Sequence, residues 1–487
     1  MPSSDGPRFR SRWVMLLAML SMAVGTGNIW RFPRIAATNG GGSFLIPWVI
    51  FLIAWSVPLL LCEFAMGKAT RRNPIGAFAE LLGPRSAWMG AWVALCATLI
   101  MFYYGVVAGW CVRYFVAAVS GELPGAEPGA LWESYAGSWW AVVTLVVSLA
   151  LAMWVVARGI RGIERSVLFM MPVLIGLVVV LAVRAVTLPG AERGLAFLFT
   201  PDLSALGNSR IWLEALTQNA WDTGAGWGLA LTYATYMRAR EDTTINAFIL
   251  GFGNNSVSLL AGIMVLCTVF SIRPDAAGEI VGAGNTGLTF IWVPQLFAAM
   301  PGGRLFMAMF FLALFFAALT SLISMIELAA RTLIDRGVSR GRALAAVAIL
   351  ALVFGIPSAL STSVLDNQDA VWGVGLMLSG LLFGVAVLRY GVDRFRREHV
   401  NSAGSDFTIG RWWNVAMLLV VAEALVLLVW WFSQTLSTEG LVASLDPIRS
   451  WSLGTLVLQW AILLAVCLGF NRWLGRTRPA GSRAGAA

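Results

Sequence analysis

Long runs of apolar residues recur along the chain, and the short stretches between them carry most of the charged residues. Twelve of these runs are long enough to cross a bilayer, because a membrane-spanning helix needs about 20 predominantly apolar residues. They are continuous, whereas the strands of a membrane β-barrel alternate polar and apolar residues over about ten positions. The pattern therefore predicts an all-α membrane protein with 12 transmembrane helices, at residues 13–37, 43–67, 87–118, 140–157, 164–186, 211–237, 243–271, 304–334, 342–359, 368–390, 412–433 and 450–472.

The composition is that of a protein whose surroundings are mostly a lipid bilayer. Of the 487 residues 59% are hydrophobic and 12% are charged, whereas a soluble domain is about one quarter charged, so an ordinary soluble enzyme is excluded. The net charge of +9 is scattered between the apolar runs, and we expect no nucleic-acid partner. One histidine, His399, and five separated cysteines offer neither a multi-histidine metal site nor a CxxC pair.

The basic residues predict how the chain is oriented in the membrane. If the N-terminus lies in the cytoplasm, 25 of the 34 lysines and arginines fall on cytoplasmic segments, as expected from the excess of basic residues in cytoplasmic loops. We therefore expect both termini in the cytoplasm. Short loops that are rich in arginine and poor in lysine suggest a multi-pass protein of a bacterial inner membrane.

Glycine clusters interrupt the first and the sixth predicted helix near the middle of each span. One cluster lies between Gly25 and Asn28, and the other lies between Asp222 and Gly228. Unwound backbone at membrane depth is tolerated where protein or a wet cavity satisfies it, and its free N–H and C=O groups suit a carboxylate and a small cation. Five helices separate the breaks, so the two helices run in opposite directions, which is typical of an inverted repeat of helices 1–5 and 6–10. Glycines that only let helices pack closely are the alternative.

Polar side chains at membrane depth accompany these breaks. Asp222 lies inside the second break, where an uncompensated carboxylate costs several kcal/mol, and Asn28 and Asn254 also lie deep within predicted helices. Together with Thr320 and Ser321 of the eighth helix, they supply oxygen atoms of the kind that bind Na⁺. Two structural alternatives remain, because a mid-helix hydroxyl often bonds to its own helix and Asn254 can cross-link helices.

Four blocks of the sequence closely resemble the neurotransmitter:sodium symporter family, whose members have the LeuT-type fold. They are GTGNIWRFP (residues 25–33), NGGGSF (39–44), IPW (46–48) and EFAMG (63–67). The resemblance extends over about residues 9–470. It implies a 5+5 inverted repeat with helices 1 and 6 unwound. It also implies Na⁺-coupled uptake of a small molecule by alternating access, without enzymatic chemistry.

On this basis we expect four parts in the chain. Residues 1–12 form a cytoplasmic N-terminal segment, and residues 13–390 form the transporter core of helices 1–5 and their inverted repeat 6–10. Residues 391–474 hold a cytoplasmic loop and helices 11 and 12, and residues 475–487 form a disordered cytoplasmic tail. The sequence indicates no oligomeric state.

The resemblance implies two sodium sites beside the broken helices. The first would be formed by the substrate carboxylate together with groups of Ala23, Asn28, Asp222 and Asn254. The second would be formed by groups of Ser21, Val24, Ala317, Thr320 and Ser321.

A substrate site and two gates follow from the same resemblance. Backbone N–H groups near Thr26 and Gly27 and the hydroxyl of Tyr104 would bind the substrate carboxylate. The rest of the site would be lined by Ala23, Ile100, Trp221, Gly224, Trp227, Ser321 and Met325. The outer gate would pair Arg31 with Asp369 above a lid of Tyr104 and Trp221, and the inner gate would include Tyr236 and Asp335.

Several positions depart from the family pattern. Asp222 stands where members usually have serine or threonine, and chloride-dependent members hold the anion between positions that match Trp48, Gln218, Asp222, Asn254 and Ser258. Trp48 replaces the usual tyrosine, and Trp221 replaces the usual phenylalanine or tyrosine of the lid. Because a carboxylate at Asp222 can balance two Na⁺ charges as chloride does elsewhere, we expect chloride independence, and proton coupling through Asp222 stays open. Phe9 replaces the usual N-terminal tryptophan, which leaves Arg8, Arg10 and Arg12 as candidate partners of Asp335.

Gly25 bears on the class of substrate. Monoamine carriers of the family have an aspartate at this position, so a glycine favours a substrate that brings its own carboxylate, namely an amino acid. We expect a large hydrophobic or aromatic one, because Gly224 leaves room and Trp227 and Met325 supply apolar, polarizable surface. Packing of Trp227 into that room is the alternative. The alternatives for function are a Na⁺-coupled carrier of another carboxylated solute (GABA-like or betaine-like) and a non-transporting amino-acid sensor.

Overall fold

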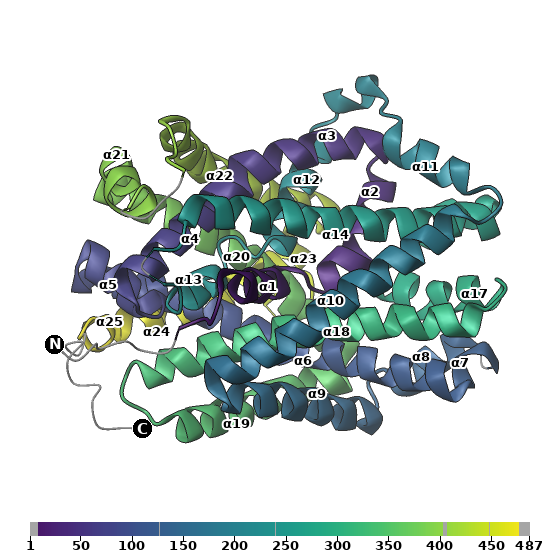
Figure 1. The fold of residues 1–487 in the computed structure, drawn as a ribbon, viewed down its shortest axis with the longest axis horizontal. Helices are drawn as coiled ribbons and strands as arrows, with labels where there is room; N and C mark the ends of the chain where they lie inside the picture. Colours follow the sequence, from purple (N-terminus) through teal and green to yellow (C-terminus); the bar gives the residue numbers. More distant parts are fainter. Residues whose placement is uncertain (1–7, 126, 239, 403–406, 448, 477–487) are drawn as a thin grey trace.

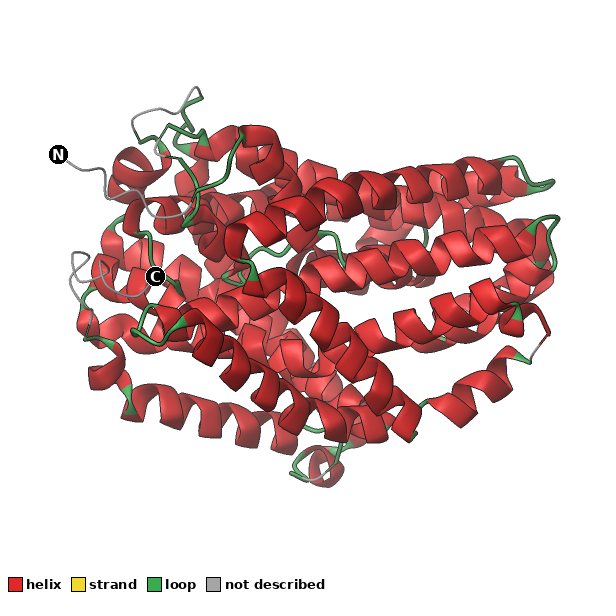
Figure 2. Cartoon of the chain, turned by 60° about the horizontal axis from the view of Figure 1, so that its bottom comes forward, coloured by secondary structure: helices red, strands yellow, loops and turns green. Residues whose placement is uncertain are grey.

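The structure, a computed structural model, describes residues 8–125, 127–238, 240–402, 407–447 and 449–476. Within these ranges every regular element is a helix, and the long helices lie side by side along the longest axis (Figures 1 and 2). The predicted terminal segments fall largely outside the described residues, since residues 1–7 and 477–487 are not part of them. The prediction of an all-helical membrane protein is confirmed for the part of the chain that is described.

Nine helical stretches of the described chain are long and apolar enough to cross a membrane. One is Gly42–Thr70, which combines α3 (Gly42–Phe51) and α4 (Val57–Thr70) across a π-helical turn. The other eight contain α6 (Ala87–Ser120), α9 (Trp139–Ala157), α10 (Gly159–Val186), α14 (Thr243–Ile272), α18 (Gly303–Ile334), α19 (Arg340–Leu360), α20 (Thr362–Tyr390) and α22 (Trp412–Glu439).

The remaining three predicted spans are bent, broken or short. The first consists of α1 (Arg12–Ala23) and the stretch Gly27–Thr38, which ends in α2 (Phe32–Thr38); the two parts are bent by 55° and together make a tenth span. The sixth is divided into α12 (Ser209–Asp222) and α13 (Leu229–Ala234), and the twelfth is the 17-residue α24 (Leu453–Gly469). All twelve predicted segments are therefore helical, although only nine or ten meet the length and hydropathy of a span.

Short helices gather at the two ends of the bundle. At one end lie α5 (Pro74–Leu82), α21 (Val392–Phe395) and α25 (Asn471–Leu474), which we call the inner end after the predicted topology (Figure 1). At the opposite, outer end lie α7 (Glu122–Gly125), α8 (Pro128–Tyr135) and α17 (Val293–Ala298) (Figure 1). The other short helices are α11 (Ala191–Phe199), α15 (Ala277–Gly282), α16 (Gly284–Thr286) and α23 (Leu441–Ser444). The predicted loops thus alternate between the two ends.

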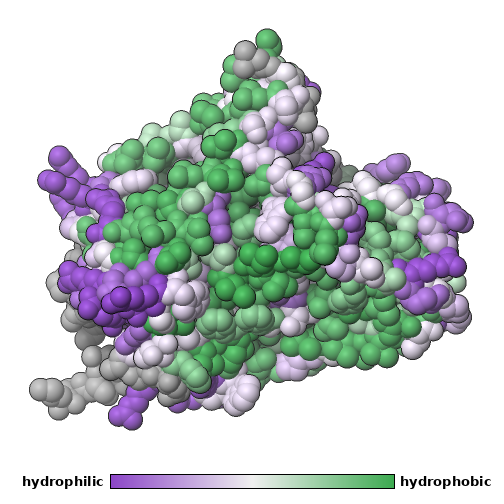
Figure 3. Space-filling model, turned by 90° about the horizontal axis from the view of Figure 1, so that it is seen from above, coloured by the Kyte–Doolittle hydropathy of each residue, from purple (hydrophilic) through white to green (hydrophobic). Residues whose placement is uncertain are grey.

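The surface has the distribution that a bilayer requires. On the face shown in Figure 3, hydrophilic residues gather at the two ends of the long axis and hydrophobic residues cover most of the surface between them. On α9 the tryptophans Trp139 and Trp140 are 70% and 69% exposed, and Trp154 is 61% exposed. Tryptophan is enriched where a membrane meets water, so α9 carries such a residue near each of its ends.

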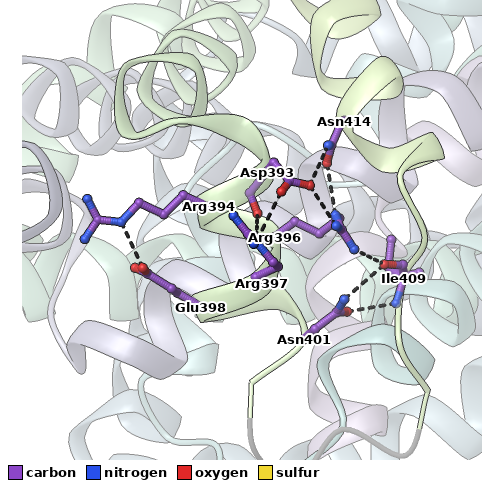
Figure 4. A network of polar contacts seen from close by, with 8 residues as sticks. All are labelled: Asp393, Arg394, Arg396, Arg397, Glu398, Asn401, Ile409 and Asn414. Carbon is purple, nitrogen blue, oxygen red and sulfur yellow. Dashed lines mark hydrogen bonds and ion pairs between the residues drawn. The ribbon is translucent and has the colours of Figure 1, made fainter.

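A polar network fixes the connection between α20 and α22 at the inner end (Figure 4). Asp393 accepts hydrogen bonds from Arg396 at 2.7 Å and from Asn414 at 3.0 Å, and these bonds lower the pKa of Asp393 to about 2. Arg396 also donates to the carbonyl of Ile409 at 2.8 Å, and Arg394 pairs with Glu398 at 2.8 Å. The loop is therefore held to the start of α22 by its own side chains.

Candidate functional site

The first break is an extended residue followed by a π-helical turn. Helix α1 ends at Ala23, Val24 is extended, and the turn Gly27–Arg31 leads into α2. A Cβ on Gly25 would lie 2.9 Å from Oγ of Ser321 and 3.1 Å from the hydroxyl of Tyr104. A larger residue here would therefore displace the side chains of Ser321 on α18 and Tyr104 on α6.

The second break needs glycine for a different reason. Between α12 and α13, Gly224, Gly226 and Gly228 have φ angles of +70°, +86° and +77°. Such left-handed conformations are strained for residues with a Cβ. A Cβ on Gly224 would meet no atom closer than 3.5 Å, so the interpretation that this glycine serves chiefly to enlarge the pocket is incomplete: the backbone conformation demands it.

Gly224→Ala is therefore expected to act on folding rather than on pocket volume. We expect it to lower the free energy of unfolding by about 1 kcal/mol, the cost of a left-handed conformation for alanine. Gly27→Ala is the matched control, because its Cβ would lie 3.7 Å from the Cβ of Asp222 and Gly27 has no positive φ. Thermal unfolding of the two purified variants measures the difference, and equal melting temperatures would contradict this assignment.

Glu63 of α4 holds the second break in place. Its side chain is fully buried, and its two carboxylate oxygens accept hydrogen bonds from the N–H groups of Gly226 at 2.6 Å and Leu231 at 3.1 Å. One donor belongs to the unwound segment and the other to the first turn of α13. N–H groups at such positions have no acceptor within a helix. Sequence reasoning used Glu63 only as part of a family motif and missed this role. A glutamate within a predicted span, here residues 43–67, was the available signal.

The structure brings together the predicted ligands of the first sodium site. Oδ1 of Asn28 accepts from the N–H of Gly25 at 2.8 Å, and Nδ2 of Asn28 donates to Oδ1 of Asn254 at 2.9 Å. The same Nδ2 donates to Oγ of Ser258 at 2.8 Å. The π-helical turn Gly27–Arg31 and α14 are therefore joined at the break by amide and hydroxyl groups, as the cross-linking alternative for Asn254 also requires.

Asp222 completes this cluster and has one free oxygen. Its Oδ2 accepts hydrogen bonds from Nε2 of Gln218 and from Oγ of Ser258, both at 3.0 Å. Its Oδ1 is buried, and no described residue bonds to it. Buried polar atoms are normally paired, and a carboxylate oxygen beside amide and backbone carbonyl oxygens is a suitable ligand for a small hard cation. The residues present therefore fit Na⁺.

The residues of the predicted second sodium site lie on α1, on Val24 directly after it, and on α18, which packs against α1. The Ser21 hydroxyl donates to the carbonyl of Ala18 at 2.7 Å. The Thr320 hydroxyl donates to the carbonyls of Phe316 and Ala317 at 2.9 and 3.1 Å. Both hydroxyls bond to their own helices, as the structural alternative expected. Because a donated proton leaves the oxygen lone pairs free, this bonding is compatible with a cation ligand.

A cavity of about 590 Å³ joins the two breaks. It contains every residue of the predicted substrate site: Ala23, Thr26, Gly27, Ile100, Tyr104, Trp221, Gly224, Trp227, Ser321 and Met325. Asn28 and Asp222 also line it, whereas Asn254, Ser21, Val24, Ala317 and Thr320 do not. The Tyr104 hydroxyl accepts a hydrogen bond from the N–H of Thr26 at 3.2 Å. The cavity therefore has a polar side near Thr26 and an aromatic side near Trp221.

The two tryptophans of the aromatic side contact each other. Their rings meet edge to face, 6.3 Å apart, and Nε1 of Trp227 donates to the carbonyl of Ala220 at 3.2 Å. Trp227 is 6% exposed. It is therefore nearly buried and also lines the cavity, whereas the atoms nearest to a Cβ on Gly224 belong to Met22 and Ala23.

The cavity extends to the outer end of the bundle. Arg31 and Asp369 both line it, but no ion pair joins them within the described chain. The guanidinium of Arg31 lies over the Trp221 ring, 5.0 Å from its centre. Exposed residues, among them Arg210 at 69% and Trp451 at 47%, also line the cavity. The predicted outer gate is therefore open in this structure.

The inner end is closed by side chains that include the predicted inner gate. The Tyr236 hydroxyl donates to Glu327 at 2.5 Å, and Glu327, which is fully buried, pairs with Arg340 at 2.5 Å. Asp335 pairs with Arg331 at 3.0 Å, and Arg331 donates to the Tyr236 hydroxyl at 3.4 Å. Tyr236 and Asp335 thus share Arg331. Sequence reasoning missed Glu327 and Arg340, although a buried carboxylate within a predicted span is a signal of function.

The N-terminal segment packs onto this inner closure. Phe9 makes edge-to-face contacts with Tyr233 and Tyr236 at 6.2 and 6.1 Å, and its N–H donates to the carbonyl of Tyr236 at 3.2 Å. Arg10, one of the three candidate partners of Asp335, pairs instead with Glu164 of α10 at 3.3 Å. Phe9 and Arg10 therefore connect the residues before α1 to the end of the sixth predicted helix and to α10.

Comparison with known proteins agrees with the geometry of the site. A sequence profile of the sodium:neurotransmitter symporter family matches residues 7–138 and 130–473. An uncharacterized sodium-dependent transporter of Methanocaldococcus jannaschii is 33% identical over 448 residues, which cover 87% of this chain and 90% of that protein. The uncharacterized sodium-dependent transporter YhdH of Bacillus subtilis is 37% identical over 371 residues, 74% of this chain and 80% of that protein.

The fold has a counterpart among solved structures. The crystal structure of MhsT in complex with L-phenylalanine has a TM-score of 0.75 and 29% sequence identity, and the match covers 87% of this chain and 98% of MhsT. Family, relatives and fold all indicate a sodium-coupled transporter that takes a small-molecule substrate and not an enzyme. The chain therefore belongs to the sodium:neurotransmitter symporter family.

Proposed function

We propose that this protein imports an amino acid with a hydrophobic or aromatic side chain, together with Na⁺, by alternating access. The observation that carries the proposal is the cavity between the two broken helices, with the Tyr104 hydroxyl and Thr26 on one side and two tryptophans on the other. A cavity with a few polar groups and an aromatic wall suits an amphipathic small molecule. L-Phenylalanine, the ligand of the MhsT complex, has this chemistry.

The polar side supports recognition of a carboxylate. The N–H of Thr26 and the Tyr104 hydroxyl bond to each other at 3.2 Å, and both can donate to a carboxylate that enters between them. Gly25 has no side chain to hold an amine, and a Cβ there would lie 3.1 Å from the Tyr104 hydroxyl. An amino acid therefore fits better than a monoamine.

Two Na⁺ ions accompany this substrate in the proposal, and chloride does not. The first ion is held by Ala23, Asn28, Asp222, Asn254 and the substrate carboxylate, and the second by Ser21, Val24, Ala317, Thr320 and Ser321. Support for chloride independence comes from Gln218 and Ser258, because both donate to Oδ2 of Asp222. These donors, which match chloride-holding positions in other members, are already satisfied by a carboxylate.

Alternating access accounts for the two gates. The outer gate of Arg31 and Asp369 closes after loading, and the closure around Tyr236 and Asp335 then opens. The proposal includes the twelve-span 5+5 inverted repeat, the core at residues 13–390, the added helices in 391–474, and the inner end with both termini on the cytoplasmic side of a bacterial inner membrane. The alternation of short helices between the two ends supports this topology.

Uptake into proteoliposomes tests the proposal. With an inward Na⁺ gradient, labelled phenylalanine, tryptophan or leucine is expected to accumulate, to stop when K⁺ replaces Na⁺, and to continue when gluconate replaces chloride. Unlabelled GABA and betaine serve as competitors, and protein-free liposomes set the background. If only GABA or betaine blocks the accumulation, the substrate belongs to that class of carboxylated solutes and not to the hydrophobic or aromatic amino acids. Saturable binding of amino acids without any Na⁺-driven accumulation would instead identify a sensor.

A further inference from the structure

A closed set of amide hydrogen bonds joins α20 to α24 near the outer end. Nε2 of Gln459 donates to Oδ1 of Asn367 at 2.9 Å, and Oε1 of Gln459 accepts from Gln368 at 3.2 Å. Gln368 also donates to Oδ1 of Asn367 at 3.0 Å, and Nδ2 of Asn367 donates to the carbonyl of Ser450 at 3.0 Å. Thr455 receives hydrogen bonds from both Asn367 and Gln459, at 3.2 and 3.1 Å. We call Asn367, Gln368, Thr455 and Gln459 the amide cluster.

Tryptophans extend the contact between the two helices. Nε1 of Trp372 donates to Oε1 of Gln368 at 2.8 Å, and Nε1 of Trp460 donates to the carbonyl of Val371 at 3.1 Å. Every amide oxygen of the cluster therefore accepts at least one hydrogen bond. A fully satisfied polar network rigidifies the elements that it joins, so the outer part of α20 is anchored to α24.

The same part of α20 carries a gate residue toward the cavity. Asp366, Asp369 and Ala370 line the cavity, whereas their neighbours Asn367 and Gln368 bond to α24. Gly373 abuts the lid, since a Cβ there would lie 1.9 Å from the Trp221 ring. The outer part of α20 thus lies between the lid and α24, and its position decides how far Asp369 stands from Arg31.

We propose that the amide cluster restrains closure of the outer gate and that Gln459 is a positioning residue of this gate. The inference rests on the proposed function, in which Asp369 closes on Arg31. In the open structure the hydrogen bonds of the amide cluster between α20 and α24 are all formed. In the same structure no ion pair joins Asp369 to Arg31 among the described residues. Movement of α20 toward Arg31 leads away from α24 and strains the cluster. The cluster therefore stabilises the open state and not the closed one.

Removing the cluster's central side chain tests this directly. Gln459→Met keeps the length of the side chain and loses its hydrogen bonds. The equilibrium constant for closure of the outer gate should rise by about 3- to 10-fold, the factor expected when one or two hydrogen bonds of the open state are lost. We expect KM for Na⁺-driven uptake to fall by this factor while kcat changes less, because a more populated closed state holds the substrate more tightly.

A labelling assay reports the gate itself. Val107 lines the cavity, so Val107→Cys gives a reporter for a membrane-impermeant maleimide, whereas none of the five native cysteines lines this cavity. In Na⁺ without substrate, Gln459→Met should slow labelling of this cysteine by about 3- to 10-fold. Asn367→Leu should do the same, and the double variant should add little to either single one, because the two side chains act in one network.

Leu456→Met is the matched control, since Leu456 is a buried apolar residue of α24 outside the cluster. Unchanged labelling and KM in Gln459→Met, or an equal shift in Leu456→Met, would overturn the proposal, as would effects of Gln459→Met and Asn367→Leu that simply add. If amino acids never slow labelling of the otherwise unaltered chain in Na⁺, the proposed substrate class fails. The comparison of Gln459→Met with Leu456→Met in Na⁺ alone still decides the role of the cluster.

Discussion

Asp222→Ser is expected to make transport depend on chloride. In a chloride-free medium the variant should lose at least about 10-fold in Na⁺-driven uptake, because removal of a buried charge that balances cations costs more than 1.4 kcal/mol. Gln218 Nε2 and Ser258 Oγ both donate to Asp222, and in the variant their donors point at a space that a chloride ion can fill. Added chloride should therefore restore a substantial part of the uptake. Proteoliposomes in gluconate and in chloride measure both effects.

The control for this variant removes a carboxylate from the same cavity without touching the donors. Asp366 is exposed, lines the cavity and forms no hydrogen bond with Gln218 or Ser258. Asp366→Asn should leave uptake independent of chloride. Full chloride-free uptake by Asp222→Ser would contradict the assignment of Asp222 as the balancing charge. If uptake is lost and chloride does not restore it, Asp222 can still be a cation ligand. The idea that its carboxylate takes the charge-balancing role of chloride would then be wrong.

The helices and their breaks were predictable because they depend on local properties. The span predicted at 243–271 is Thr243–Ile272 in the structure, where Asp242 caps the helix by accepting from the N–H of Ile245 at 2.7 Å. The span predicted at 304–334 is Gly303–Ile334. Hydropathy and capping residues set such ends. The second break followed from a cluster of glycines, which the structure explains by left-handed backbone conformations and, at Gly226, also by the close approach of the Gly380 backbone.

The contacts that hold the site were not predictable, because they join residues far apart in sequence. Glu63 bonds to Gly226 across 163 positions, and Tyr236 bonds to Glu327 across 91. Hydrophobic periodicity says which side of a helix is buried and not which helix it meets. The ligand set came from family resemblance, and the cavity then brought all ten predicted substrate residues together. The amide cluster had no counterpart in the motifs, so only the structure reveals it.

Glu63→Gln is expected to destabilise the transporter through the second break. The wild-type carboxylate accepts from two backbone N–H groups at 2.6 and 3.1 Å while fully buried. A glutamine retains one oxygen acceptor and turns an NH₂ group toward the other N–H, which leaves a buried donor unsatisfied. A buried donor that is left without an acceptor costs about 1–3 kcal/mol, so the variant should lose about 1–3 kcal/mol of stability. Glu63→Leu, which leaves both donors unpaired, should lose more.

Glu80→Gln separates this effect from loss of a carboxylate in general. Glu80 lies on α5, is 44% exposed and pairs with Arg72 at 2.5 Å, and exposed ion pairs contribute about 0–1 kcal/mol. In thermal unfolding of the purified proteins, Glu63→Leu should therefore have the lowest melting temperature and Glu63→Gln the next lowest. Glu80→Gln should melt close to the wild type. Gly226 lies within the stretch from Gly224 to Leu229 that helps to line the cavity, and Leu231 follows it. Na⁺-driven uptake should therefore fall in the same order. A Glu63→Gln protein that melts and transports like the wild type would show that the unwound segment holds its shape without the two carboxyl oxygens of Glu63.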